Sequence, residues 1–313
     1  MRKNIDKSLV SVIMTVYNAQ DFVQEAVVSI LEQTYSNLEL IIVNDGSNDE
    51  TLKILNNLRK NDSRIRVISL NRNYGPSYAS NIGIKEAKGT YIARMDADDV
   101  SLPTRIQKQV NYLEKHPKTV ILGGQCKLIN KDGKSVGRKN FPTKHNDIYK
   151  SLFKINPIQH PSCMINVDLI GKDRFFYNTK HVLAHDLELI FYLSQFGKLA
   201  NLKDSVLCYR LHSDSLSLKN PKNTFKATLS VRKNSVKKYG YKTDFVGRLM
   251  NLVQTIVVYF LPREAIYPIY RILRMNKNES LNEVFADVSR FVKSSFSTRF
   301  SFIKTNLDTY LAK

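Results

Sequence analysis

The feature that most constrains the fold of this 313-residue chain is an alternation of short apolar runs with amphipathic stretches over its first 99 residues. Residues 9–17 and 38–43 are nearly continuous apolar runs, which is typical of strands buried on both faces of a parallel sheet. Between them, residues 21–34 place apolar side chains at helical spacing. The pattern predicts a βαβ unit and, with it, an α/β fold on a mainly parallel sheet.

Further strands and helices are expected in the same part of the chain. Ser47 is followed three residues later by Glu50, a spacing typical of a capping box at the start of a helix. A third strand is expected at residues 64–70. Gly75, which precedes a proline, suits the turn that leads into the next helix. A fourth strand is expected at residues 90–95.

Three carboxylates follow the fourth expected strand directly, although the chain has a formal net charge of +20. Asp96, Asp98 and Asp99 stand so close together that each raises the pKa of its neighbours unless a cation lies among them. Mg²⁺ or Mn²⁺ with oxygen ligands is the simplest such cation, and it normally keeps coordination positions for substrate phosphates. An exposed acidic turn without a ligand is the alternative for this motif taken alone.

A second acidic turn contains Asp45 and follows the second expected strand. In open parallel sheets, ligands bind outside the carboxyl ends of the strands. We therefore expect Asp45 to lie at the same edge of the sheet as the three later aspartates. Together the two turns predict a site for a metal ion and a nucleotide diphosphate.

Three segments, residues 10–51, 73–99 and 101–109, carry a specific resemblance to a known family. Their motifs, in this order and spacing, resemble the nucleotide-sugar-binding half of glycosyltransferase family 2. The resemblance implies the GT-A fold, which is a Rossmann-like, mainly parallel sheet flanked by helices. It runs through roughly the first 115 residues and weakens after them.

The same resemblance implies how the chain is divided. Residues 1–219 would form the GT-A catalytic domain, with residues 1–115 as its nucleotide-sugar-binding half and residues 116–219 as its acceptor half. Residues 220–313 would then be a basic, amphipathic, helical C-terminal region.

On the donor side, the resemblance implies a nucleoside pocket. Thr15, Val16 and Tyr17 match positions that line this pocket in the family, and Asp45 would contact the base or the ribose. For Asp45 the alternative is a turn aspartate that accepts hydrogen bonds from local backbone amides.

The resemblance also implies the residues around the metal ion and the diphosphate. Asp96 and Asp98 match the family's metal and nucleotide motif, while Asp99 would share the charge or orient its neighbours. His212 is a candidate third metal ligand, with a solvated loop histidine as the alternative. Arg210 would approach the diphosphate. The cofactor expected is Mg²⁺ or Mn²⁺.

On the acceptor side, Asp186 matches the aspartate of a Glu-Asp pair that begins a helix in the family, and would act as the general base. His185 stands where that glutamate is usual, a departure from the family pattern. His160 and Ser162 would face the acceptor or the donor phosphate. A helix-start carboxylate favoured by the helix dipole is the alternative for Asp186.

These roles predict an inverting, metal-dependent, hexosyltransferase-like enzyme. It would move a sugar from a nucleotide-diphosphate sugar, by family habit a UDP-sugar, to a hydroxyl of a lipid-linked or growing surface polysaccharide. One alternative is a sugar-nucleotide nucleotidyltransferase, which is expected to have a glycine-rich loop where residues 15–20 have no glycine. The other is a non-enzymatic basic binding protein on a GT-A-like fold, but no RNA-recognition or zinc-finger motif indicates a nucleic acid partner.

The positive charge is concentrated near the end of the chain. Residues 220–313 hold 17 Lys or Arg against 6 Asp or Glu, a net charge of +11, which favours an anionic partner. Residues 245–275 alternate apolar patches with arginines and tyrosines, and predict peripheral contact with a membrane. A packing appendage or a contact in a homo-oligomer is the alternative.

The expected location is the cytoplasm, at the inner face of the cell membrane. Three widely spaced cysteines without metal-ligand spacing argue for a reducing compartment. No run of apolar residues is long enough to predict a spanning helix.

Overall fold

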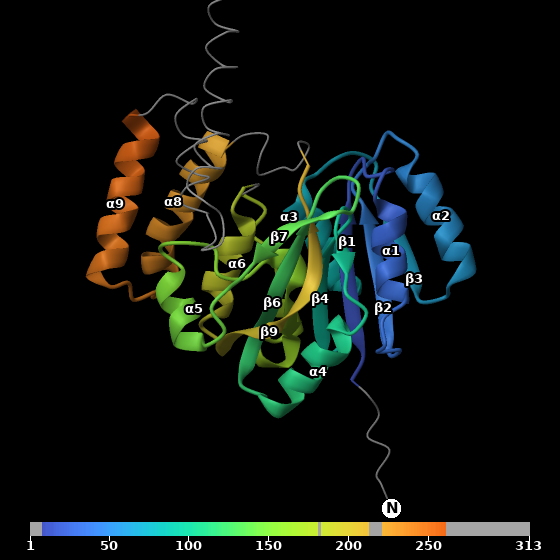
Figure 1. The fold of residues 1–313 in the computed structure, drawn as a ribbon, viewed down its shortest axis with the longest axis horizontal. Coiled ribbons are helices and arrows are strands. Elements are labelled where there is room, and N and C mark those ends of the chain that lie inside the picture. Colours follow the sequence, from blue (N-terminus) through green and yellow to red (C-terminus); the bar gives the residue numbers. More distant parts are fainter. Residues whose placement is uncertain (1–7, 181–182, 213–220, 261–313) are drawn as a thin grey trace, which may run out of the picture.

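The protein is a nine-stranded sheet with helices on both faces, as seen in a computed structural model that describes residues 8–180, 183–212 and 221–260 (Figure 1). The strands lie in the order β3-β2-β1-β4-β8-β6-β9-β5, and β7 pairs with β6. Their bounds are β1 (Val10–Val16), β2 (Leu38–Asn44), β3 (Ile65–Ser69), β4 (Tyr91–Asp96), β5 (Val100–Ser101), β6 (Thr119–Ile129), β7 (Ser135–Lys139), β8 (Met164–Asn166) and β9 (Lys198–Arg210).

The four strands from β3 to β4 are parallel, which confirms the predicted βαβ units. Thr15 of β1 pairs with Asp96 of β4, and Val16 pairs with Asn44 of β2. The carboxyl ends of these three strands are therefore level with one another. Beyond β4 the sheet is mixed, since β8 runs antiparallel to both β4 and β6.

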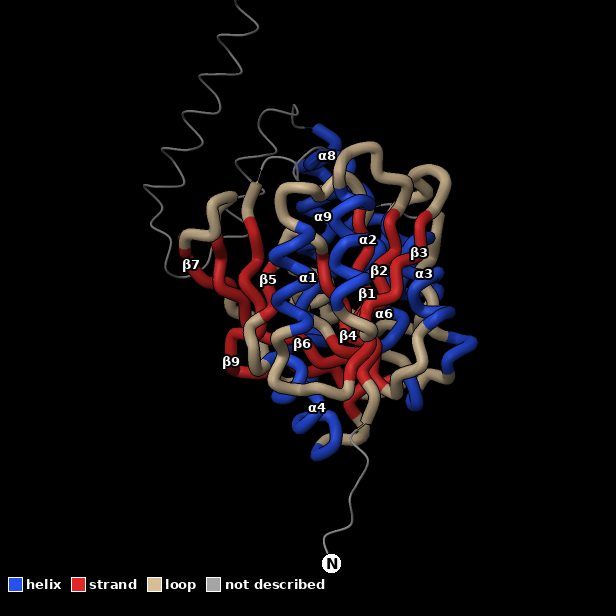
Figure 2. Tube along the Cα trace, turned by 90° about the vertical axis from the view of Figure 1, so that its right-hand side faces the viewer, coloured by secondary structure: helices blue, strands red, loops and turns tan. Residues whose placement is uncertain are grey.

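The α-helices are α1 (Val23–Leu31), α2 (Thr51–Asn61), α3 (Pro76–Glu86), α4 (Arg105–Lys115), α5 (His145–Ser151), α6 (His185–Leu193), α8 (Pro221–Lys238) and α9 (Phe245–Phe260). Short 3₁₀ helices are η1 (His160–Ser162), η2 (Val167–Leu169) and η3 (Lys172–Arg174). In Figure 2, α1 and α2 lie on one side of β1, β2 and β3, and α3 lies on the other side.

Two hydrophobic layers sandwich the sheet, because its central strands are apolar on both faces. Along β1, Val12 and Met14 pack in the layer that includes α1 and α4, whereas Ile13 packs in the layer that includes α3 and α6. Successive side chains of a strand point to opposite faces, so a continuous apolar run can supply both layers. This arrangement fixes β1 rigidly beneath the site at its carboxyl end.

The helix predicted after Ser47 is present as α2, but the predicted capping box is wrong. The Ser47 hydroxyl instead accepts a hydrogen bond from the backbone N–H of Asn18 at 3.0 Å. At the start of α2, the backbone N–H of Thr51 donates instead to Oδ1 of Asp49 at 3.0 Å. The Ser47 side chain therefore joins two separate turns and does not cap the helix.

Helices α8 and α9 extend the molecule on the side away from α1 and α2 (Figure 1). Val231 of α8 and the following Tyr241 belong to the same core cluster as the apolar side chains of α6. Within the described residues, no helix is both long enough and apolar enough to cross a membrane. The domain boundary at residue 219 stays a prediction, and expectations for residues 261–313 lie outside the described residues.

Candidate active site

Both acidic turns lie at one edge of the sheet, as the sequence predicts. The backbone N–H of Asp45, directly after β2, donates to the carbonyl oxygen of Val16 at 2.8 Å. Asp96 is the last residue of β4 and pairs with Thr15 of β1. The edge formed by β1, β2 and β4 therefore carries the candidate site.

The aspartates after β4 form a compact group of oxygen ligands. Carboxylate oxygens of Asp96, Asp98 and Asp99 all lie within 4.8 Å of one another. Oδ1 of Asp99, whose residue is 1% exposed, accepts a hydrogen bond from the backbone N–H of Arg210 at 2.9 Å. Its Oδ2 is buried and has no hydrogen-bond partner among the described residues. The three carboxylates could hold a metal ion, and the part of each as a ligand stays a prediction.

The surroundings of the group oppose its ionisation. Desolvation first, and then the charge of Asp98, raises the pKa of Asp96 to about 6, although Arg94 acts in the opposite direction. Burial also raises the pKa of Asp99 well above its usual range, and its two aspartate neighbours add to that effect. A divalent cation would reverse both effects, and oxygen-rich carboxylate sites suit Mg²⁺ or Mn²⁺. The residues therefore fit the predicted metal.

His212 lies beside this group rather than within it. Its Nε2 is 2.8 Å from Oδ2 of Asp98, and its ring packs against Phe22 with the ring centroids 5.2 Å apart. In this position the imidazole orients the Asp98 carboxylate. Its predicted role as a direct metal ligand stays a prediction.

Arg210 fixes the acidic turn through hydrogen bonds of its guanidinium group. Its side chain is 2% exposed, and its Nε donates to the carbonyl oxygen of Asp98 at 2.7 Å. The two Nη atoms donate to the carbonyl oxygen of Lys131 at 2.8 Å and to Oε2 of Glu25 at 2.6 Å. With all three nitrogens engaged, this guanidinium fixes the turn in place, and its predicted approach to the diphosphate stays a prediction.

Two buried arginines beneath the turn were missed by the sequence analysis. Nη2 of Arg105 donates to the carbonyl oxygen of Arg94 at 2.6 Å, and burial lowers the pKa of Arg105 to about 10. Nη2 of Arg94 lies 3.9 Å from Oδ1 of Asp96. Together they place positive charge under the acids. The signal in the sequence was an arginine inside an otherwise apolar strand, since a buried charge requires a partner.

Asp45 is buried and makes two backbone contacts. Its Oδ1 accepts from the N–H of Tyr74 and its Oδ2 accepts from the N–H of Gly75, both at 2.8 Å. This is the arrangement of the alternative in which a turn aspartate satisfies backbone amides. The carboxylate thereby holds the loop before α3 at the edge of the sheet, and its contact with a nucleoside stays a prediction.

The other residues expected in the nucleoside pocket differ in exposure. Tyr17 is 46% exposed directly after β1 and offers an aromatic face at the edge of the sheet. Thr15 is partly buried, and its hydroxyl lies 3.4 Å from Nη2 of Arg94. Val16 is buried in the core, so its side chain supports the strand from within the apolar layer.

Asp186 approaches from the second half of the chain, at the start of α6. Its Oδ2 accepts a hydrogen bond from Nδ2 of Asn156 at 2.6 Å. The charge of Asp186 also contributes to the raised pKa of Asp96, after desolvation and the charge of Asp98, so the two carboxylates lie near enough to interact. Ala184, in the left-handed conformation at a φ of 58°, sets the start of the helix.

His160 and His185 form an aromatic wall with Tyr177 next to this carboxylate. Nε2 of His160 lies 2.7 Å from Oη of Tyr177, and the two histidine ring centroids are 5.6 Å apart. Desolvation, followed by Arg94 and His185, holds the pKa of His160 well below its usual range. The imidazole is therefore neutral at pH 7.

Ser162, in contrast, is fully buried, and its hydroxyl donates to the carbonyl oxygen of Gln159 at 2.7 Å. The structure brings His160, His185 and Asp186 to one side of the acidic turn. It leaves Ser162 within the core below them.

A mixed sheet flanked by helices, with clustered carboxylates at the carboxyl ends of its parallel strands, is the architecture of GT-A glycosyltransferases. The model of the family described as Glycosyl transferase family 2 matches residues 11–171. The chain belongs to this family and is a glycosyltransferase. Membership in this family supports a glycosyltransferase over both the nucleotidyltransferase and the non-enzymatic basic protein on a GT-A-like fold.

Relatives of known sequence extend over most of the chain. An uncharacterized glycosyltransferase of Haemophilus influenzae is 32% identical over 263 residues, which cover 82% of this chain and 81% of that protein. The O-antigen biosynthesis glycosyltransferase WbnJ of Escherichia coli is 35% identical over 210 residues, 66% of this chain and 81% of WbnJ. The E. coli UDP-Glc:alpha-D-GlcNAc-diphosphoundecaprenol beta-1,3-glucosyltransferase WfaP is 33% identical over 234 residues, 75% of this chain and 88% of WfaP.

Solved structures confirm the fold. S. aureus TarS in complex with UDP-GlcNAc matches with a TM-score of 0.62 at 16% identity, over 91% of this chain and 80% of that chain. The mannosyltransferase PcManGT of Pyrobaculum calidifontis, in complex with GDP-Man and Mn²⁺, matches with a TM-score of 0.58 at 14% identity, over 93% and 80%. At these identities the likeness shows the GT-A fold alone.

Proposed function

We propose that this chain is an inverting, metal-dependent glycosyltransferase that moves a hexosyl group from a UDP-sugar to a hydroxyl of a lipid-linked or growing polysaccharide. The observation that carries the proposal is the group of Asp96, Asp98 and Asp99 at the strand edge, which could hold a metal ion and lies near enough to Asp186 for the carboxylates to interact. One group would bind the donor, and the other would activate the acceptor.

Donor binding involves the edge formed by β1, β2 and β4. The exposed ring of Tyr17 offers a stacking surface for the base, and the loop held by Asp45 closes the edge beside it. A divalent cation held by Asp96, Asp98 and Asp99 would neutralise charge that develops on the leaving diphosphate. The UDP in the TarS complex and in the name of WfaP supports a UDP-sugar, and the GDP-Man of PcManGT is the alternative.

Asp186 acts as the general base. Its carboxylate accepts the proton as the acceptor oxygen forms a bond to the anomeric carbon and the bond from that carbon to the diphosphate oxygen breaks. A single displacement of this kind inverts the anomeric configuration. Asn156 holds the carboxylate by donating to Oδ2 at 2.6 Å, so the second oxygen is available to the hydroxyl.

The names of two relatives support the acceptor class. WbnJ is named for O-antigen biosynthesis, and WfaP is named for a sugar linked to diphosphoundecaprenol. An acceptor of that kind is anchored in lipid, and would place this enzyme at the cytoplasmic face of the cell membrane.

The test separates the two carboxylate groups. In a panel of UDP-, GDP- and dTDP-sugars with Mn²⁺, Asp186→Asn is expected to lower kcat by about 10²- to 10⁴-fold while donor binding, measured by calorimetry, is retained. Asp98→Asn is expected to abolish the dependence of donor binding on Mn²⁺. Asp147→Asn on α5, an exposed position, is the matched control and should behave as the wild type.

Three results would contradict the proposal. Wild-type protein that binds none of these nucleotide sugars in the presence of Mn²⁺ would exclude the donor class. Full activity of Asp186→Asn would exclude this residue as the base. A product that retains the anomeric configuration of the donor, detected by NMR, would exclude the single displacement.

A further inference from the structure

Helix α9 carries an apolar face that no described part of the chain covers. It packs against α8 through buried Gln254 and Val258, and lies at the outside of the molecule (Figure 1). Large apolar side chains are exposed along α9 at spacings of three and four residues. They are Phe245 (79% exposed), Val246, Leu249, Leu252 (57% exposed), Val253, Ile256 and Tyr259. A contiguous exposed stripe of this kind marks an interaction surface.

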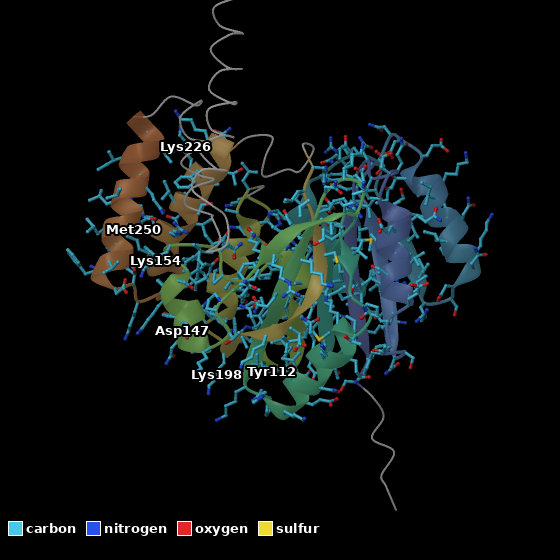
Figure 3. The ribbon with its side chains drawn as sticks, viewed as in Figure 1. Tyr112, Asp147, Lys154, Lys198, Lys226 and Met250 are labelled. Atoms are coloured by element: carbon cyan, nitrogen blue, oxygen red, sulfur yellow. The ribbon has the colours of Figure 1, made fainter. Side chains whose placement is uncertain are left out.

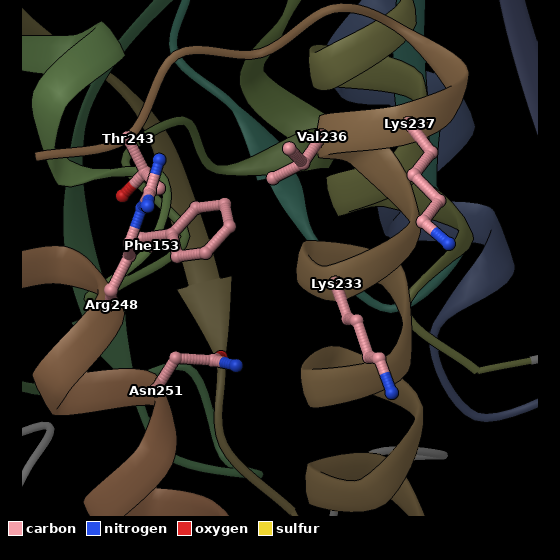
Figure 4. A pocket seen from close by; sticks show the side chains of 7 residues that line it. All are labelled: Phe153, Lys233, Val236, Lys237, Thr243, Arg248 and Asn251. Atoms are coloured by element: carbon pink, nitrogen blue, oxygen red, sulfur yellow. The ribbon is translucent and has the colours of Figure 1, made fainter.

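A basic pocket of about 260 Å³ lies next to this stripe, between α8 and α9 (Figure 4). Lys233 and Lys237 of α8 and Arg248 of α9 line it, and none of its lining residues is acidic. The three cationic groups make no hydrogen bond or ion pair with any described residue. Phe153 and Val236 supply its apolar wall. The volume is below the roughly 300–1,000 Å³ of pockets for drug-sized ligands, so it suits a small anionic headgroup.

The cations extend along the same side of the molecule. Lys226 of α8 lies with its Nζ 5.1 Å from the ring centroid of Tyr259, at the far end of the stripe. Figure 3 places Lys226, Met250 and Lys154 on the side formed by α5, α8 and α9. Unpaired positive charge thus flanks the apolar face.

We propose that the surface formed by α8 and α9 binds the phosphate-bearing headgroups of an anionic lipid bilayer, with the stripe of α9 in the boundary between headgroups and acyl chains. An amphipathic helix with basic residues beside an apolar face lies in the plane of a membrane in this way. A second copy of the chain would bring the same unpaired cations to the interface, and the acid beside the stripe, Asp244, already accepts a hydrogen bond from the backbone N–H of Gly247 at 2.6 Å. Charge complementarity therefore favours lipid.

This binding goes beyond the proposed reaction and does not depend on its donor or its base. Vesicle binding is accordingly measured on the full chain without any nucleotide sugar or metal. Its failure would leave the donor-binding experiment unaffected, and the reverse also holds.

The experiment is flotation with vesicles of phosphatidylglycerol and phosphatidylcholine, and with vesicles of phosphatidylcholine alone. The wild type is expected to float with the anionic vesicles at low salt and to dissociate as salt is raised. Lys233→Gln/Lys237→Gln/Arg248→Gln should lower the partition coefficient on the order of 100-fold. The matched control, Arg59→Gln/Lys60→Gln/Lys85→Gln, removes three exposed cations from α2 and α3 and should bind as the wild type.

The apolar face is tested by Leu252→Ser/Ile256→Ser, which should also lower partitioning on the order of 100-fold. Both side chains are exposed, so the thermal midpoint of the variant should match that of the wild type. Val136→Ser, at an exposed position on β7, is the control for loss of an apolar side chain.

Three results would overturn the inference. The wild type could fail to float with anionic vesicles, or the two sets of charge variants could bind equally. Light scattering could also show a dimer that dissociates in Leu252→Ser/Ile256→Ser without any vesicle binding, which would assign the stripe to a second copy.

Discussion

The backbone N–H of Arg210 donates to Oδ1 of Asp99 at 2.9 Å and so joins two positions that are 111 residues apart in the sequence. The side chain of the same arginine holds the carbonyl oxygen of Asp98. The end of β9, in the second half of the chain, therefore fixes the acidic turn that follows β4. The geometry of the candidate metal site depends on both halves of the sheet.

Replacing Arg210 should loosen that turn. Arg210→Gln removes a buried guanidinium that bonds to two carbonyl oxygens and to Glu25, and is expected to lower the free energy of unfolding by about 3 kcal/mol. Mn²⁺ affinity, measured by calorimetry on the folded variant, should fall about tenfold, because the turn is no longer held. Arg59→Gln on α2 is the control. Unchanged stability together with unchanged Mn²⁺ affinity would contradict this role.

The raised pKa of Asp99 predicts a variant that is more stable but does not bind metal. A carboxyl group whose pKa is higher in the folded state than in the unfolded state destabilises the fold when it is ionised. In EDTA at neutral pH, Asp99→Asn should therefore unfold at a higher temperature than the wild type. Because one ligand is lost, Mn²⁺ should then stabilise the wild type and leave the variant unchanged.

The pKa of Asp96, raised to about 6, gives the same argument a pH window. Without metal, the stability of the wild type relative to Asp96→Asn should decrease as pH rises from about 4, near the pKa of an unfolded aspartate, through about 6. Mn²⁺ should remove this decrease. Asp147→Asn, an exposed substitution, controls for the loss of one charge. An unchanged difference in stability between the wild type and Asp96→Asn over this range would argue against the assigned shift.

Gly46, in the turn that contains Asp45, should tolerate no side chain. Its φ is +69°, and a Cβ atom there would lie 2.4 Å from the backbone carbon of Arg72. Gly46→Ala is expected to lower the free energy of unfolding in urea by about 3 kcal/mol. Gly240→Ala is the matched control, because Gly240 has a φ of +63° but nothing within 4 Å of a Cβ atom, and should lose only about 1 kcal/mol. Equal losses would exclude the contact with Arg72.

The sequence was sufficient to predict the parallel strands and the acids at their edge, because both follow from local pattern. Buried strands read as apolar runs, and the carboxyl ends of parallel strands necessarily share an edge. The roles of Arg210 and Arg105 were not predictable in this way, because each depends on carbonyl oxygens supplied by distant segments. The hydroxyl of Ser47 was misassigned for the same reason, since it bonds to Asn18 in another turn.

Candidate residues in the second half were harder to place. His160 and Ser162 are two positions apart, yet His160 faces Tyr177 whereas Ser162 is buried in the core. The short 3₁₀ helix η1 turns the side chains of His160 and Ser162 in different directions. No periodic pattern in the sequence predicts so short an element. Their residue types therefore made both His160 and Ser162 candidates for the site. Only the backbone conformation shows that their side chains have different surroundings.

The lowered pKa of His160 makes the last prediction, which concerns acid stability. The unfolded chain takes up a proton at this histidine as pH falls through about 6.5, whereas the folded protein, in which Arg94 and His185 oppose the charge, does not. The free energy of unfolding should therefore decrease between about pH 7 and pH 5, by at most about 1.4 kcal/mol per pH unit from this group.

In His160→Gln, whose amide can still hydrogen-bond to the hydroxyl of Tyr177, this part of the decrease should disappear. Urea denaturation at several pH values over the same range measures it for each protein. His116→Gln, at an exposed position after α4, controls for the removal of a histidine. If His160→Gln and the wild type lost stability in parallel as the pH fell, His160 would have to take up its proton in the folded protein, and the neutral aromatic wall beside Asp186 would be wrong.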